Sequence, residues 1–389
     1  MGTYISSNAN RFYTVIEATY GQAATVTAAN RFPAVRLQAH QVLVPGKRQD
    51  KTGSRTFLGV SPSSRRKTAF EVRTYLTSWS AVGEPSYGPL FHAGLGAAPQ
   101  YSSGLVVASM PNSTQIQTTV PHGLLPGAAI SYMGEIRFVT GVPASQLLNV
   151  NAPFSNLAQP NASLSPVITY QLATSLPSVT LYDYWDATNS IDRIVTGAGV
   201  DTLEVTVNGD YHSFAFSGPA ADLLNASTLI PGTGGLSSFP AEPALGSFDY
   251  SIVPGHLGQV WLGNPLNQYF TMTAANIAVK NNLDLRNQEF GTSYPAAIVP
   301  GPREVAATFT LMVEDDAQTT GLYAAGKQRT PVSAMLQLGQ QQGQLMAIYL
   351  PNMMPELPAY NDAETRLQWS FSNNLAQGTA NDELYIAFA

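Results

Sequence analysis

Short runs of alternating apolar and polar residues follow one another along most of the chain, and Gly or Pro separates many of them. Because successive side chains of a strand point to opposite faces, this alternation is typical of strands that bury one face in antiparallel sheets. Long stretches with the three-to-four-residue spacing of an amphipathic helix are nearly absent. The pattern therefore predicts an all-β fold with minor α content.

The clearest predicted hairpin covers residues 200–217. Its Asn208-Gly209 pair fits the two positive-φ positions of a type I′ turn between two alternating strands. Pairing across such a turn would place Val205 opposite His212 on a face that packs into the core. The side chains expected on the opposite, polar face are Thr202, Glu204, Thr206, Tyr211 and Ser213.

The C-terminal part of the chain shows the same alternation. Strands are expected at 305–313, 335–338, 345–350, 367–371 and 384–388. The strongest helix candidate is 317–327, because Glu314, Asp315 and Asp316 precede it and negative charge stabilises the N-terminal end of a helix. A short second helix is predicted at 220–226.

Turn residues and strand spacing divide the chain into three blocks. Residues 1–100 and 176–389 are predicted to carry the first and second parts of the main β structure. The block 101–175 is predicted to be a small all-β insertion. Its strands are expected at 105–108, 130–132, 136–142 and 147–150.

The two outer blocks echo each other in pattern at a constant offset of 237 residues. At this offset Val72 falls on Phe309, within two segments that alternate in the same phase. Val42 falls on Val279 at the same offset. We therefore hypothesise that the chain contains two copies of one β fold.

Charge and composition narrow the function classes. The 389 residues carry 19 Lys+Arg and 25 Asp+Glu, a formal net charge of −6, and charged residues make up only 11% of the chain. A hydrophobic content of 44% excludes intrinsic disorder. The negative charge gives no general attraction to phosphate backbones, which argues against a sequence-independent nucleic-acid binder. Low charge suits a surface that copies of the same chain cover, because interface cores are depleted of charge.

The sequence offers no catalytic, cofactor-binding or metal-ligating residues. It contains no Cys, which excludes a disulfide scaffold, thiolate-bound zinc and thiol catalysis. The five His stand at no zinc-like spacing, and no Gly-x-Ser-x-Gly elbow occurs. Residues 321–327 approach a P-loop, but Gln328 stands where the magnesium-binding Ser or Thr is required. We therefore expect no cofactor and no enzymatic activity.

We also expect no membrane partner. Residues 1–6 lack the basic and apolar regions of a signal peptide, and no later run approaches 18 uninterrupted apolar residues. The expected product is a soluble protein made in the cytoplasm.

One segment concentrates positive charge, and two interpretations of it stand. It consists of Lys47, Arg48, Lys51, Arg55, Arg65, Arg66 and Lys67. Nucleic-acid contact is one interpretation. The favoured one is an exposed loop that forms ion pairs with an acidic neighbouring subunit.

Several short segments of the sequence resemble segments of the major tail tube proteins of long-tailed phages. The carrying segments are 196–201 (TGAGVD), 281–286 (NNLDLR), Phe290-Gly291, 300–305 (PGPREV) and the alternating strand 307–313 that runs into Glu314-Asp315-Asp316. The resemblance implies two packed antiparallel sheets flanked by a helix. It further implies that the inner sheet joins those of neighbouring subunits into a closed β barrel around a channel for DNA, and that rings stack through long loops.

The resemblance also suggests a stoichiometry. Rings of this family have six tube folds, so a chain with a duplicated fold would form trimeric, pseudo-hexameric rings, and a hexamer of single-fold chains is the alternative. The insertion 101–175 would decorate the outer wall. The implied partners are further copies of the chain, the tape measure, tail terminator and distal tail proteins, and genomic DNA that passes through the lumen without specific binding. The implied location is the tail of the virion.

Residue roles follow as expectations from this resemblance. The lumen-facing candidates are Asp201, Glu204 and Asp210. The candidates for the contact between rings are Lys47, Arg48, Lys51, Arg65 and Arg66. Arg303 is expected at a seam between subunits.

Two other function classes stay open. A carbohydrate-binding or hydrolytic β protein of the phage adsorption apparatus would need exposed aromatic side chains near carboxylates. The segment Tyr182-Asp183-Tyr184-Trp185-Asp186 has this composition, although a packed strand is the favoured interpretation. A capsid or decoration protein would share the overall composition.

Overall fold

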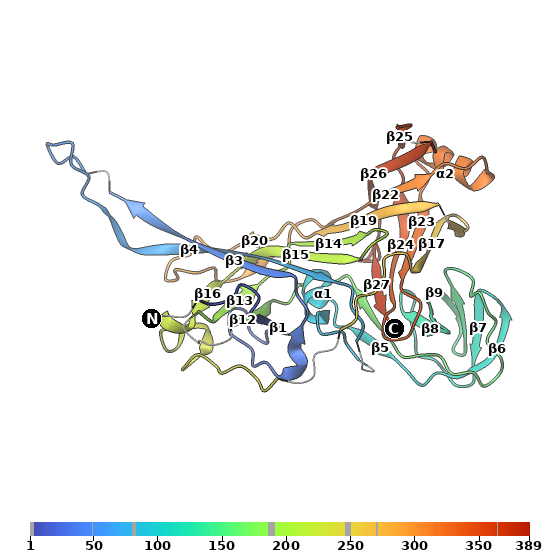
Figure 1. Ribbon diagram of the computed structural model, residues 1–389, viewed down its shortest axis with the longest axis horizontal. Coiled ribbons are helices and arrows are strands. Elements are labelled where there is room, and N and C mark those ends of the chain that lie inside the picture. The colour runs from blue at the N-terminus through green and yellow to red at the C-terminus, as the bar shows by residue number, and fades with distance from the viewer. Residues whose placement is uncertain are drawn as a thin grey trace.

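The computed structural model describes residues 4–48, 50–79, 83–185, 191–245, 250–269, 271–363 and 365–389. These residues form mainly strands, arranged in antiparallel sheets that pack against one another (Figure 1). The predicted all-β class with minor α content is confirmed.

One large sheet runs along the length of the molecule (Figure 1). Its main path has the order β18-β17-β23-β24-β26-β22-β19-β14-β15-β4-β3. The bounds of these strands are β3 Arg36–Lys47, β4 Val60–Tyr75, β14 Thr202–Val207, β15 Ser213–Ala220, β17 Gly258–Gly263, β18 Asn267–Tyr269, β19 Met272–Lys280, β22 Glu304–Met312, β23 Val332–Leu338, β24 Met346–Met354 and β26 Gln368–Ala376.

Short strands extend this sheet on two sides. β27 (Tyr385–Phe388) pairs with β24, β11 (Val167–Gln171) pairs with β27, and β5 (Gln100–Ser102) pairs with β11. β25 (Ala359–Asn361) pairs with β26.

A second sheet has the order β16-β13-β12-β1-β2, and helix α1 (Gly88–Leu95) contacts strands of both sheets. Phe91 of α1 lies at the centre of the core, with its ring 5.1 Å from Phe214, 5.2 Å from Phe216 and 5.1 Å from Phe388. The same apolar core contains Phe12, Leu181 and Val195 of the second sheet, so both sheets share one core. The strands of the second sheet are β1 Asn10–Ile16, β2 Arg31–Phe32, β12 Val179–Trp185, β13 Arg193–Ala198 and β16 Asp222–Asn225.

A third sheet is separate and has its own apolar core. The chain leaves the large sheet at β5 and returns at β11. Between them lie β6 (Val107–Asn112), β7 (Gln115–Thr118), β8 (Ala129–Tyr132), β9 (Glu135–Ala144) and β10 (Leu147–Val150), in the order β6-β7-β10-β9-β8. The exact limits 101 and 175 of the insertion stay a prediction.

A buried arginine fixes this third sheet on the large one. The Arg137 side chain is fully buried and lies 5.2 Å from the ring of Phe154 and 5.3 Å from that of Trp261. Its guanidinium donates to Glu135 at 3.0 Å and to Gln259 of β17 at 3.1 Å. The buried charge is thus paired and hydrogen-bonded, as burial requires.

The predicted helix 317–327 is confirmed as α2 (Ala317–Gln328). Its N-cap is Asp316, whose carboxylate accepts a hydrogen bond from the Thr319 N–H at 2.6 Å. The predicted helix 220–226 is wrong, because Ala220 ends β15 and residues 222–225 form β16, which pairs with β13 over four residues and buries Leu224. The remaining short elements are the 3-10 turns Ala28–Asn30, Ala226–Thr228 and Thr233–Gly235 and the strand pair β20 (Asp284–Leu285) and β21 (Ile298–Val299).

The hairpin 200–217 exists, but its predicted turn and register are wrong. β14 and β15 pair with Val205 opposite Phe214, not opposite His212. The connection is longer than a two-residue turn because the Asn208 side chain accepts hydrogen bonds from the N–H groups of Asp210 and Tyr211, both at 2.9 Å. The shift of two residues keeps the same side chains on the core face.

Candidate assembly surfaces

The middle of the large sheet has one apolar and one polar face. Strands β3, β4, β15, β14, β19 and β22 lie side by side, and residues directly opposite one another share a face. One such row is fully apolar and buried, and it consists of Leu37, Val72, Phe216, Leu203, Val279 and Val305.

The adjacent rows point away from the core and carry small or polar side chains. One row consists of Arg36, Arg73, Ala215, Glu204, Ala278 and Ala306. The next consists of Gln38, Glu71, Ser217, Thr202, Lys280 and Glu304. Ion pairs within this polar face join Arg73 to Glu71 at 2.6 Å and Lys280 to Glu304 at 3.9 Å. Positive and negative charges therefore offset each other across this surface.

The three residues predicted to face the lumen occupy different environments. Glu204 is exposed on the polar face of β14. Asp201 is half-buried and accepts a hydrogen bond from the Leu283 N–H at 2.8 Å, so it holds the chain that follows β19. Asp210 is exposed in the loop after β14. The structure thus brings only Glu204 onto the polar face itself.

The pair β14·β19 lies in the middle of a run of eight strands, β25-β26-β22-β19-β14-β15-β4-β3. Within the part of the chain that the structure describes, β3 pairs only with β4, and β25 pairs only with β26. Both ends of the run therefore present an unpaired strand edge, which is a template for pairing with another chain.

The two halves of this run correspond strand by strand. In the hairpin β14–β15, Thr206 lies opposite Ser213. In the hairpin β25–β26, Asn361 lies opposite Gln368, and the connection has the same length. The buried aromatics of the two hairpins also coincide, Phe214 and Phe216 in one and Trp369 and Phe371 in the other.

The correspondence extends to the neighbouring strands. Phe216 lies opposite Val72, and Phe371 lies opposite Phe309, so Val72 and Phe309 are equivalent. These are the residues that the 237-residue offset superposes. In β3 the equivalence shifts by one residue, because Leu37 pairs with Val72 whereas Ala275 pairs with Phe309. The predicted equivalence of Val42 and Val279 is wrong, because the Val42 side chain is exposed and the Val279 side chain is buried.

The basic segment forms most of a long hairpin arm that projects from one end of the sheet (Figure 1). Lys47 lies opposite Val60 at the last strand pair, and residues 48 and 50–58 of the connection are exposed. The arm also exposes large apolar side chains, namely Val42, Leu43, Val44, Phe57, Leu58 and Val60. A two-stranded hairpin with this surface gains little stability alone in water, which indicates that it packs against a partner.

The predicted contact residues of this arm divide into two groups. Lys47, Arg48 and Lys51 are exposed on the arm, where Arg48 pairs with Asp50. Arg65 and Arg66 lie at its base and are engaged within the chain. Arg65 donates to the Gln288 carbonyl at 3.3 Å, and Arg66 forms an ion pair with Asp222.

Arg303, the predicted seam residue, joins three segments of its own chain. Its guanidinium donates to the Ala173 carbonyl and to Asn381 at 3.3 Å, and it lies 3.6 Å from the Glu383 carboxylate. Burial lowers the pKa of Arg303, and Glu383 counteracts this effect. The residue therefore fixes the start of β22 against the C-terminal segment.

The aromatic segment of the glycan-binding alternative is mostly core. Tyr182 and Tyr184 are buried and their rings stack at 5.6 Å, while Asp183 forms an ion pair with Arg193. Asp186 lies outside the described residues. The described side chains of this segment thus form no exposed aromatic platform.

The described ranges contain no cluster of three or more metal-ligating side chains. Among the same residues, no helix has the length and apolar character needed to cross a membrane. Residues 321–327, the P-loop-like stretch, lie within α2.

A comparison with protein-family models decides between the open classes. Residues 7–374 match the family described as phage tail tube protein. The chain belongs to the phage tail tube protein family. No curated protein matches it. The family is a structural one, typically without enzymatic activity, and its members are components of the virion tail that associate with their own copies and with other tail proteins.

Sequence reasoning missed two features of these surfaces. It did not recognise β25 as an edge, because a three-residue strand that contains the exposed Tyr360 gives too short an alternation. It also missed α1, whose side chains Leu90, Phe91 and Leu95 are all buried, so that its sequence shows no amphipathic period.

Proposed function

We propose that this tail tube protein forms trimeric rings that stack into the channel for DNA ejection. The observation that carries the proposal is the internal pair β14·β19. It joins two equivalent four-stranded units head to tail, β25-β26-β22-β19 and β14-β15-β4-β3. Each unit is taken as one copy of a duplicated tube fold.

The same junction can be repeated between chains. β3 is equivalent to β19, and β25 is equivalent to β14. The two free edges, on β3 and β25, therefore resemble the two edges that already pair with each other in β14·β19. Such a head-to-tail interface generates a ring when the rotation closes. Two units in each chain favour three chains in a ring, and a hexamer is the alternative.

The internal junction also specifies a register between chains. Glu204 lies opposite Ala278 in β14·β19. Through the equivalences of the two units, Glu204 corresponds to Ala359 and Ala278 corresponds to His40. Ala359 of one copy should therefore lie opposite His40 of the next, and both side chains are exposed in the single chain.

The polar face supports a role as the channel lining. Its side chains are small or polar and its charges offset one another, with Glu204 against Arg36 beside the two ion pairs, so it offers DNA no strong attraction. The third sheet would then lie on the outer wall. DNA would pass without specific binding, and the ends of the tube would contact the tape measure, terminator and distal tail proteins.

Cross-linking tests this ring. The natural chain has no Cys, so the double variant His40→Cys/Ala359→Cys provides a clean background. Directly opposed side chains in an antiparallel pair lie close enough for a disulfide or a short thiol cross-linker. The proposal predicts a denaturation-resistant ladder that ends at three chains.

The matched control is Arg36→Cys/Ala359→Cys, in which the first thiol moves four residues along the exposed side of β3. It should give no ladder. Equal ladders from both variants, or none from either in assembled material, would contradict the proposed edge pairing.

A further inference from the structure

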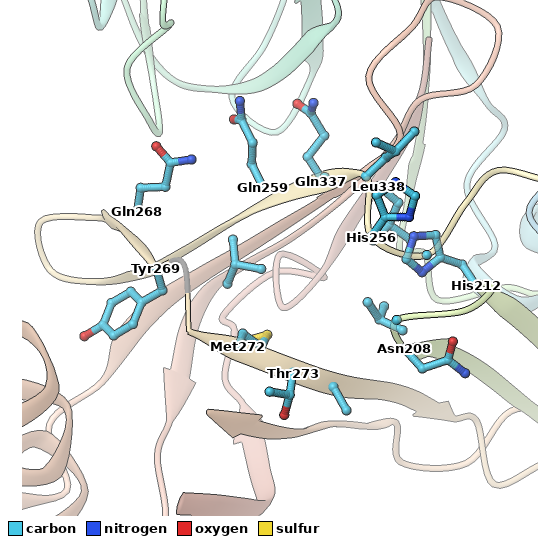
Figure 2. A pocket seen from close by; sticks show the side chains of 17 residues that line it. Asn208, His212, His256, Gln259, Gln268, Tyr269, Met272, Thr273, Gln337 and Leu338 are labelled. Atoms are coloured by element: carbon cyan, nitrogen blue, oxygen red, sulfur yellow. The ribbon is translucent and has the colours of Figure 1, made fainter. Parts of the chain in front are cut away.

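A cavity of about 500 Å³ lies beside the loop that joins β14 to β15, between that loop, the strands β17 and β18 and the start of β19 (Figure 2). Its size is that of a binding pocket for one or two large side chains. The apolar side chains that line it are Val207, Leu257, Val260, Tyr269, Met272 and Leu338.

Polar side chains complete the lining, among them the two histidines His212 and His256. Figure 2 shows Gln259, Gln268 and Gln337 on one side of the cavity and Asn208 and Thr273 on another. An apolar lining with neutral amides suits an apolar side chain better than a charged ligand.

This cavity and the hairpin arm lie at opposite ends of the same strands. At one end of the strands, Lys47 lies opposite Val60 on the arm. The row that contains Glu204 lies further along the strands, and Val207 lies opposite Ala275 at the other end. The loop after Val207 and the start of β19 therefore mark the end remote from the arm. If rings stack along these strands, the arm of one ring meets the cavity end of the next.

The connection at the end of the arm carries apolar side chains, which fit an apolar cavity. Phe57 and Leu58 are adjacent, and 61% and 50% of their surfaces are exposed. They lie in the connection between Lys47 and Val60 on the projecting arm, together with the other exposed apolar side chains of the arm.

The charges of the two ends are complementary. The arm carries Lys47, Arg48, Lys51 and Arg55 against the single carboxylate of Asp50. The opposite end carries Asp210, Glu314, Asp315 and Asp316, and also Asp362 and Arg366 of the β25–β26 connection, so carboxylates outnumber basic side chains among these residues. Asp316 lies close enough to the cavity residue Tyr269 to contribute to the raised pKa of its hydroxyl, after the larger effect of burial. Opposite charges at the two ends fix orientation and accelerate association.

From these observations we propose that the Phe57-Leu58 tip of one copy inserts into the cavity lined by Met272 and Val260 of a copy in the next ring. The inference rests on the proposed stacked rings, and it adds the site that receives the arm. It assigns the cavity to a second copy of this chain and not to a small ligand.

Ring formation and ring stacking can be measured separately. In Phe57→Ser/Leu58→Ser, single rings should form at the wild-type yield, as measured by mass photometry. The fraction of protein in tubes, measured by sedimentation and negative-stain electron microscopy, should fall by about tenfold or more, because the apolar contact between rings is lost.

The matched control is Leu125→Ser. Leu125 is exposed on the connection between β7 and β8 of the third sheet, and its replacement should leave the tube fraction unchanged. Wild-type stacking of the arm variant would overturn the inference while leaving the ring proposal intact. Loss of rings in the arm variant would also overturn it, because the arm would then act within a ring.

A second pair of thiols identifies the receiving site directly. Leu58→Cys/Thr273→Cys should link chains of successive rings and give a ladder that continues beyond three chains. Leu125→Cys/Thr273→Cys should give no such ladder. Tubes of the first variant that form but do not cross-link would show that the arm binds elsewhere, and saturation of the cavity by a small molecule would assign it to a ligand.

Discussion

The two four-stranded units share one packing scheme but differ in what extends from it. Both place a pair of aromatics from a hairpin against the adjacent strand, Phe214 and Phe216 in the first unit and Trp369 and Phe371 in the second. The first unit carries the long arm, and the chain inserts the third sheet after its helix α1. In the second unit the connection between β19 and β22 forms the strand pair β20–β21 and not an extended arm, and no insertion follows α2.

Features that both units share are those that the fold needs, and features that only one unit has are candidates for a role in assembly. The buried rows and the hairpin register recur, so they are the conditions for forming the unit. The arm and the third sheet occur once in each chain, so a ring of three chains would carry three of each at alternate positions. Differences between the units are thus candidates for roles outside the single chain.

The largest expected effect tests whether the two units are equivalent. Phe216→Ala and Phe371→Ala remove side chains that are fully buried at equivalent positions. Each should lower the free energy of unfolding by about 3–5 kcal/mol, because a cavity remains in a packed core. Denaturant titration of both variants measures this, and a cost confined to one of them would contradict equivalent packing.

A second prediction uses a difference between the equivalent hairpins. His212 is buried, whereas the equivalent position of the second hairpin is Leu367. Burial lowers the pKa of His212 to about 4, and the nearby Leu257 backbone has a smaller, opposite effect. The unfolded chain therefore binds this proton at a higher pH than the folded chain does.

The stability of the folded chain should therefore fall as the pH is lowered. Between pH 6.5 and about 4 only the unfolded state gains the proton, so stability should fall by about 3 kcal/mol as the pH is lowered through this window. Urea titrations of the wild type and His212→Leu at several pH values measure this. The variant should have a shallower dependence, and an identical slope in both proteins would assign it to other groups.

The smallest expected effect concerns the two helices. α1 has no side-chain N-cap and is held by its buried residues, whereas α2 is largely exposed and is capped by Asp316. Asp316→Ala should cost about 1 kcal/mol, and Asp316→Asn should retain most of the stability because Asn also caps. Thermal unfolding measures both, and equal losses in the two variants would argue against capping.

The sequence sufficed for the features that alternation encodes. The strand 305–313, the helix 317–327 and the identity of the core face of the first hairpin all follow from local pattern and charge. The family was also predictable, because its carrying segments lie in these regular strands and their connections. The same local pattern could not distinguish a two-residue turn from the longer loop that the Asn208 side chain stabilises.

The assembly surfaces were less predictable for a physical reason. The edge β25, the cavity and the engagement of Arg65, Arg66 and Arg303 depend on contacts between segments far apart in the chain. Arg303, for example, donates to Ala173 and contacts Glu383. A residue type in a sequence does not show whether its partner lies in the same chain or in a neighbour.

The mass of a single ring tests the central claim most directly. Mass photometry of rings released from purified tubes would count the chains, each of 41.5 kDa. Two tube units in each chain predict rings of three chains. Rings of six chains would contradict the duplicated unit, and a monomer that never assembles when concentrated would contradict the edge pairing on which the ring depends.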